Sequence, residues 1–160
     1  MMKTIIGAVT LLAVTAAFAP TVGAETTMFG MGIIVGEPTG IGAKLHLDSG
    51  NALAFGLAWS LEGDNELHIH TDYLFHNYDL IPVEQGQLPL YFGVGGRIKI
   101  NEEHHGRGGD DNVGVRFPVG LAYIFEGAPF DVFMEIVPIL DLAPDTDFDL
   151  NGAIGGRYWF

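Results

Sequence analysis

The chain has 160 residues, of which 48% are hydrophobic, and its formal net charge is −13, from 7 basic and 20 acidic residues. Such a length is enough for one domain. The acidity argues against binding to nucleic acid, because a phosphate backbone requires a basic surface. The chain has no cysteine, so its fold does not rely on disulfides.

The N-terminus has the layout of a secretory signal peptide. Lys3 precedes a short apolar run from Ile5 to Phe18, and small residues stand before Ala24. We therefore expect residues 1–24 to be a signal peptide, cleaved after Ala24, and residues 25–160 to be one domain. The apolar run is shorter than the roughly 20 residues that a transmembrane helix needs, and a retained N-terminal helix is the alternative.

Clusters of Gly, Pro, Asn and Asp divide the rest of the chain into segments that read as strands joined by hairpin turns. In chain order, the eight expected strands are Phe29–Val35, Ile41–Leu47, Ala52–Leu61, Glu66–Asp79, Leu88–Asn101, Asn112–Phe125, Phe130–Leu142 and Phe148–Phe160.

The fourth segment shows the pattern most clearly. Its odd positions are mostly apolar or aromatic, as at Ile69 and Tyr73, whereas its even positions include His68, His70 and Asp72. Successive side chains of a strand point to opposite faces, so one face is apolar and the other is polar. Most other segments repeat this alternation, with polar faces that mix charges and glycines. Five apolar residues stand on the polar faces: Leu74, Ile124, Phe133, Val137 and Ile139.

An even number of alternating strands of about 9–11 residues is typical of a transmembrane β-barrel. Closure satisfies every backbone donor and acceptor, and eight strands enclose an interior that side chains fill. We therefore predict an all-β fold, an eight-stranded antiparallel up-and-down transmembrane β-barrel. Pro118 and Pro138 lie inside expected strands, where we expect a bulge or a strand end.

The last seven residues carry a family resemblance. Ile154, Tyr158 and the terminal Phe160 are large apolar residues at alternate positions, and the segment resembles the C-terminal strand that the barrel-assembly machinery recognises in bacterial outer-membrane proteins. The mature chain as a whole resembles small outer-membrane barrels of the OmpA-like and opacity-protein type. It departs from them in having no C-terminal peptidoglycan-binding domain and no long surface loops, which argues against those specific functions.

This resemblance implies an outer-membrane location, contact with outer-membrane lipid, and recognition by the assembly machinery through Tyr158 and Phe160. It also implies periplasmic termini. The outer loops would then be Glu37–Thr39, Gly63–Asn65, Glu102–Asp111 and Ala143–Asp147.

Ten charged residues fall on the polar faces and would therefore lie in the barrel interior. They are Lys44, Asp72, Arg97, Lys99, Arg116, Asp131, Glu135, Asp141, Asp149 and Arg157. Isolated buried charges are very costly, so we expect these residues to pair in a salt-bridge network that plugs the lumen. A gated ion path is the alternative use of the same charges.

Three histidines of one face, His68, His70 and His76, are weak candidates for a metal site. Two histidines at i and i+2 project from one side of a strand about 7 Å apart, but the sequence names no third ligand, and hydrogen bonding in the lumen is the simpler interpretation. The loop Glu102–Asp111 mixes carboxylates and imidazoles, and it is either a site for a divalent cation or surface partner or a solvated loop.

An enzymatic hypothesis rests on Ser60. A turn centred on Asp64 would pair Ser60 with His68, as a lipid-modifying hydrolase would need, but Ser60 would point into the barrel, away from acyl chains. We therefore expect a non-enzymatic barrel without a cofactor, with a structural or surface-interaction role. The alternatives are a narrow channel for ions or small solutes (porin-like), a lipid-modifying hydrolase, and a soluble periplasmic lipocalin-like binding barrel.

Overall fold

The computed structural model describes residues 28–59, 66–101 and 111–160. Outside these ranges lie the predicted signal peptide, Ser60 and residues 102–110 of the loop Glu102–Asp111. The described residues form nine strands: β1 Phe29–Gly36, β2 Thr39–His46, β3 Asn51–Trp59, β4 Glu66–Asn77, β5 Leu90–Asn101, β6 Asn112–Arg116, β7 Val119–Ile124, β8 Phe130–Ala143 and β9 Asp147–Trp159.

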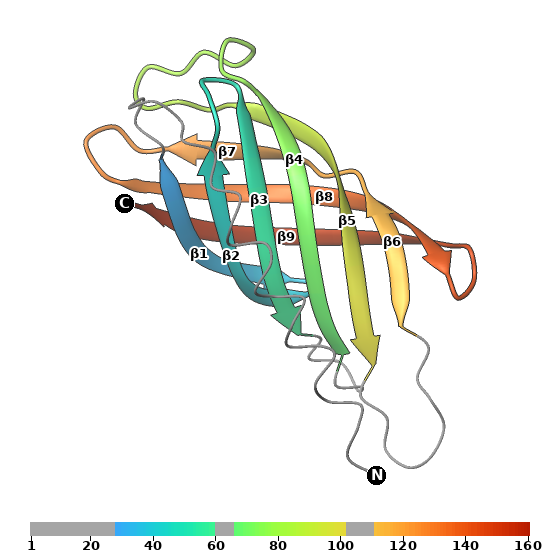
Figure 1. Cartoon of the computed structure of the whole chain (residues 1–160). Coiled ribbons are helices and arrows are strands. Elements are labelled where there is room, and N and C mark those ends of the chain that lie inside the picture. The colour runs from blue at the N-terminus through green and yellow to red at the C-terminus, as the bar shows by residue number, and fades with distance from the viewer. Residues whose placement is uncertain (1–27, 60–65, 102–110) are drawn as a thin grey trace.

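All nine strands belong to one antiparallel sheet that closes into a ring (Figure 1). Apart from β6 and β7, which do not pair with each other, each strand pairs with its neighbour along the chain, and β1 also pairs with β9, which joins the two ends of the sheet. This confirms the predicted all-β antiparallel class. Within the described residues, no helix is long and apolar enough to cross a membrane.

The predicted count of eight strands was wrong, because the expected sixth strand, Asn112–Phe125, is divided into β6 and β7. The two pieces occupy one position in the ring, since both pair with β5 on one side and with β8 on the other. Their register is continuous across the break: Arg116 opposes Ile139 and Val119 opposes Ile136. The ring therefore has eight strand positions.

The two prolines explain the break. Pro118 has no N–H to donate, although its carbonyl accepts a hydrogen bond from Gly93 at 2.9 Å, and Phe117 donates to the carbonyl of Pro138 at 2.9 Å. In an antiparallel pair the N–H and C=O of one residue point to the same neighbour. The N–H that Pro118 lacks would have bonded to Gly93, and the N–H that Pro138 lacks would have bonded to the carbonyl of Phe117. The ladder therefore loses two hydrogen bonds at the consecutive residues Phe117 and Pro118. The strand end expected at Pro118 is confirmed. The bulge or strand end expected at Pro138 is wrong, because β8 continues through it in unbroken register with β9.

The strand pairs also fix the shape of the ring. A path from partner to partner leads from Gly30 through Lys44, Ala54, Asp72, Gly95, Arg116 and Ile139 to Asp149. Asp149 lies four residues before Ala153, which pairs with Gly36, so the path returns ten positions further along β1 than it began.

For eight positions about 4.8 Å apart, a displacement of ten residues of about 3.3 Å gives a strand tilt of about 40° and a radius of about 8 Å. Strands on opposite walls then cross at a large angle, as β8 and β9 cross β3 and β4 in Figure 1.

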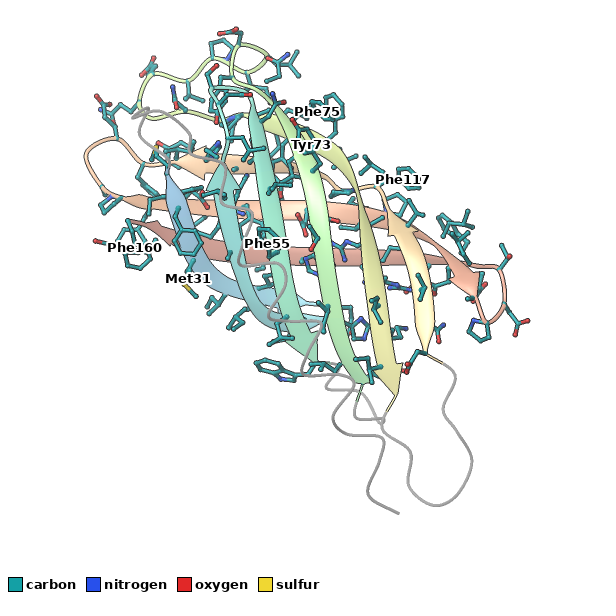
Figure 2. All side chains as sticks on the ribbon, viewed as in Figure 1. Met31, Phe55, Tyr73, Phe75, Phe117 and Phe160 are labelled. Carbon is teal, nitrogen blue, oxygen red and sulfur yellow. The ribbon has the colours of Figure 1, made fainter. Side chains whose placement is uncertain are left out.

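The barrel is apolar outside and polar inside. Leu57, Phe92 and Val119 are 40%, 49% and 48% exposed, whereas Arg97 is 2% exposed. Figure 2 shows other apolar side chains, including Phe75, Phe117 and Phe160, projecting away from the wall. The interior is narrow enough to require glycine: a Cβ on Gly56 of β3 would overlap the ring of His70 on β4.

We predict that Gly56→Ala lowers the free energy of unfolding by about 1–3 kcal/mol, because an added methyl group overpacks the lumen. The matched control is Gly152→Ala on the outer face of β9, where no atom lies within 4 Å of the added methyl group. Urea titration of the two refolded variants compares these costs, and equal costs would contradict the packing described here.

Candidate functional site in the barrel lumen

The inward side chains form layers along the barrel. We call the end where β1 begins and β9 ends the terminal end, and the other the opposite end. On β4 the inward residues run from His76 at the terminal end through Leu74 to Asp72, and on β8 they run from Asp131 through Phe133 to Glu135. Leu74 and Phe133 thus lie between polar residues on their strands, and beyond Glu135 the inward face of β8 continues with the apolar Val137 and Ile139.

The layer at the terminal end is ionic and aromatic. Arg157 Nε donates to Asp131 Oδ1 at 3.0 Å across the β8–β9 pair, and Trp159 Nε1 donates to Asp131 Oδ2 at 2.9 Å. Lys44 Nζ lies 2.6 Å from His76 Nε2 and 4.8 Å from the centre of the Tyr91 ring. The carboxylate of Asp131 thus joins β8 to two residues of β9.

An apolar layer follows. Its buried members are Ile34, Leu74, Tyr91, Ala122 and Phe133, which come from five different strands. Tyr91 also connects this layer to the next one, because its hydroxyl donates to Glu135 Oε2 at 2.8 Å. The guanidinium of Arg157 lies 4.2 Å from the centre of the Phe133 ring, so this layer packs directly against the ionic layer at the terminal end.

The next layer contains a fully buried ion pair. Arg116 Nε of β6 donates to Asp72 Oδ1 of β4 at 3.0 Å over the intervening β5, and both side chains are at least nine-tenths buried. His70 Nε2 lies 3.9 Å from Asp72 Oδ2. Because a lone buried charge is so costly, Asp72 and Arg116 each depend on the other.

Arg97 organises the layer at the opposite end. Its guanidinium donates to Asp141 through Nε at 3.1 Å and Nη2 at 2.7 Å, and Nη2 also donates to Asp149 Oδ2 at 3.0 Å. Lys99 Nζ lies 3.6 Å from Glu66 Oε2, and His68 Nε2 lies 3.3 Å from the same oxygen. The bidentate geometry of Arg97 holds β5, β8 and β9 together.

The structure pairs seven of the ten predicted charges with one another, and the other three contact residues outside the predicted set. Asp72 and Arg116, Asp131 and Arg157, and Arg97 with Asp141 and Asp149 form direct pairs. Lys99 contacts Glu66, Glu135 contacts Tyr91, and Lys44 contacts His76.

The three histidines of β4 do not converge. His68 contacts Glu66, His70 approaches Asp72, and His76 contacts Lys44 and the Gly50 carbonyl. Among the described residues, no group of three or more His, Asp or Glu side chains could hold a metal ion. The register pairs His68 with Ala58, so the predicted pairing of His68 with Ser60 was wrong. The turn centred on Asp64 that was assumed for that pairing placed the partner of His68 two residues after Ala58, its actual partner.

The sequence reasoning missed three contributors. Trp159 binds Asp131, Tyr91 binds Glu135, and Glu66 binds Lys99. Strand parity could have found each of them, because Trp159 alternates with the outward Tyr158 and Phe160, and Glu66 shares the face of His68. Tyr158 and Phe160 are outward and exposed, with ring centres 4.9 Å apart.

Two small cavities lie in the described lumen. One cavity of ≈ 30 Å³ is lined by residues that include His70, Asp72, Phe133, Glu135 and Arg157. A second, of ≈ 10 Å³, lies beside it, since both border Ile34, His70 and Glu135. His70 Nδ1 and Arg157 Nη2 are buried without a protein partner. The larger cavity is the size of one or two waters, which would satisfy these atoms.

The fold and the lumen together define a closed antiparallel β-barrel with an ionic interior and an apolar outer face. The chain belongs to the family described as protein of unknown function (DUF3996), whose model matches residues 23–150. Among solved structures it is similar to the N-terminal β-barrel domain of Pseudomonas aeruginosa OprF, with a TM-score of 0.62 and 13% identity, over 84% of this chain and 98% of that one. No curated protein matches the chain. At this identity the likeness supports the barrel fold alone.

We predict that Asp72→Leu lowers the free energy of unfolding by about 3–5 kcal/mol, because it leaves Arg116 buried and unpaired. Adding Arg116→Met should recover most of this loss. The control is Lys99→Met, whose partly exposed contact with Glu66 should contribute about 1 kcal/mol or less. Urea titration of the four proteins measures these values. A double variant no more stable than Asp72→Leu would contradict the pairing.

Proposed function

We propose that this chain is a non-enzymatic bacterial outer-membrane β-barrel with a structural or surface-interaction role and a lumen plugged by ion pairs. One observation carries the proposal: the large apolar side chains face outward around the described barrel, while Lys44, Arg97, Arg116 and Arg157 are buried inside. A water-soluble barrel would place these two classes the other way round. For this reason the distribution also speaks against a lipocalin-like binding barrel.

Aromatic side chains support a membrane setting. Phe29, Phe130, Tyr158 and Phe160 contact one another in pairs at the terminal end. Phe148 is exposed near the other end of β9, ten residues from Tyr158. At about 3.3 Å per residue and a tilt of about 40°, ten residues rise about 25 Å, the height of the apolar band of outer-membrane barrels.

The filled lumen favours a structural role over a channel. An ion entering from the opposite end would meet Arg97 with its two carboxylates, then the Asp72–Arg116 pair, and then the apolar layer of Ile34, Leu74 and Phe133. Water-sized cavities between these layers do not add up to a path for a hydrated ion. Conduction would require several buried pairs to separate together.

The remaining parts of the proposal rest on the sequence. They are export through residues 1–24, and recognition of the strand that ends in Tyr158 and Phe160 by the barrel-assembly machinery. The outward, exposed positions of these two rings are compatible with such recognition, because a binding partner reaches them without unfolding the barrel. A lipid-modifying hydrolase would depend on Ser60, and the register of β3 and β4 removes the support that it drew from His68.

Two outward residues of β8 test the membrane setting. Ile136 lies near the middle of the apolar band and Leu142 near its edge. We predict that Ile136→Arg makes folding into phospholipid vesicles less favourable by about 2–4 kcal/mol, and that Leu142→Arg makes it less favourable by about 1 kcal/mol or less. The two costs differ because the cost of a charge depends on its depth in the bilayer. Equal, small costs at both positions would mean that this face meets water.

Planar-bilayer recording separates a closed barrel from a narrow channel. We expect the purified full chain to insert without producing stepwise ion currents, because the lumen is blocked by paired charges and by an apolar layer. Reproducible single-channel steps would overturn the plugged-lumen proposal in favour of the channel. Far-ultraviolet circular dichroism of the same purified protein, reconstituted into phospholipid vesicles, would confirm that it is folded.

A further inference from the structure

The connection between β4 and β5, residues 78–89, differs from the other turns at the terminal end. The turn between β2 and β3 is built from Asp48, Ser49 and Gly50, and Asp48 Oδ1 accepts hydrogen bonds from the backbone N–H groups of Gly50 and Asn51 at 2.7 Å each. The Asn51 side-chain amide donates to Asp48 too, and it holds the pKa of this exposed carboxyl below its usual value. That turn is polar and suited to water.

The longer connection carries four consecutive apolar residues, Leu80-Ile81-Pro82-Val83. Leu80 is 57% exposed and Val83 is 38% exposed. These four residues belong to no strand and pair with none, so they are not part of the barrel wall. Large exposed apolar side chains in a turn are unfavourable in water, and their presence points to an apolar surrounding.

The second half of the connection continues the wall beside β7, because Gln87 opposes Ile124 in the same register that pairs Leu90 with Leu121. Gln87 and Ile124 exchange backbone hydrogen bonds of 3.1 Å and 2.8 Å. Tyr123, which alternates with the buried Ala122 and so faces outward, donates its hydroxyl to the Gln85 carbonyl at 3.1 Å. Gly86 adopts a φ of 70°, and a Cβ there would collide with the Ile124 carbonyl. These contacts hold the segment against the end of β7.

The point of attachment belongs to the aromatic surface of the terminal end. Tyr123 packs edge-on against Phe125 with ring centres 4.9 Å apart, and Phe125 is exposed. In Figure 1 the connection extends from the ends of β4 and β5 beyond the wall at this end. The four apolar residues lie two to five positions before Gln85, whose carbonyl accepts the hydrogen bond from Tyr123. They therefore stand close in the chain to the aromatic part of the outer face, which is the surface that the proposed function assigns to lipid.

We propose that residues Leu80–Val83 form an interfacial anchor that inserts into the lipid leaflet at the terminal end of the barrel. The inference rests on the proposed membrane location and adds to it a specific contact made by a segment outside the barrel wall. Apolar residues that enter the boundary between headgroups and acyl chains bind through the area that they bury, while the aromatic residues beside them suit the interface. The anchor fixes the depth of the barrel in the bilayer.

The absence of cysteine allows a direct test. Three single variants of the full chain, Leu80→Cys, Ser49→Cys and Ile154→Cys, are labelled with a fluorophore that shifts to the blue in apolar surroundings and are reconstituted into phosphatidylcholine vesicles. Ser49 is the matched control in the polar turn at the same end, and Ile154 is the control in the apolar band. Quenching by iodide in water is compared with quenching by nitroxide-labelled phosphatidylcholine.

We expect the label at position 80 to be blue-shifted, shielded from iodide and quenched by the nitroxide lipid, as at position 154, and the label at position 49 to be quenched by iodide. A label at position 80 that behaves like that at position 49, while position 154 remains in lipid, overturns the anchor and leaves the proposed function intact. Iodide quenching at position 154 would instead contradict the membrane location itself.

Discussion

Closure of the hydrogen-bonded ring is the constraint on which the rest of the structure depends. Because β1 pairs with β9 and every other strand has a neighbour on each side, the sheet formed by the described residues has no free edge, and each residue of its strands must face either the lumen or the outside. The ten-residue displacement around the ring sets the tilt and hence a radius that side chains alone can fill. A single register shift would exchange the two faces of a strand and place charges outside.

The narrow interior explains the character of the lumen. Charged side chains from different strands meet within hydrogen-bond distance, as Arg97 meets Asp141 and Arg116 meets Asp72. In so narrow a lumen, the inward side chains of strands two positions apart in the ring reach each other over the strand between them. The apolar layer around Phe133 separates two ionic layers and leaves a water-sized cavity beside it. Such a lumen is suited to holding strands together. The small cavities beside His70 show where the packing is incomplete.

Much of this arrangement follows from strand parity. The alternation in segments such as Glu66–Asp79 was sufficient to predict the antiparallel class, and it assigned Arg97 and Asp72 to one kind of face. Which acid meets which base was out of reach, because Arg97 and Asp141 are 44 residues apart in the chain and their meeting depends on register and tilt. The five apolar residues that broke the pattern were left unexplained, although four of them, Leu74, Phe133, Val137 and Ile139, are buried inside. β8 continues through Pro138, whose carbonyl accepts a hydrogen bond from Phe117 on the neighbouring strand position. The sequence of one strand does not show which residue of the next strand it will pair with.

Contacts between side-chain methyl groups and lipid acyl chains provide the most direct test of the inside-out barrel. Nuclear Overhauser effects would be measured on methyl-labelled full chain in phospholipid nanodiscs. The account predicts acyl-chain contacts at Leu57, Val119 and Ile136, and none at Leu74, Val137 and Ile139, so that neighbours on β8 give opposite results. Acyl-chain contacts at Val137 and Ile139, with Leu57 and Val119 free of them, would contradict it.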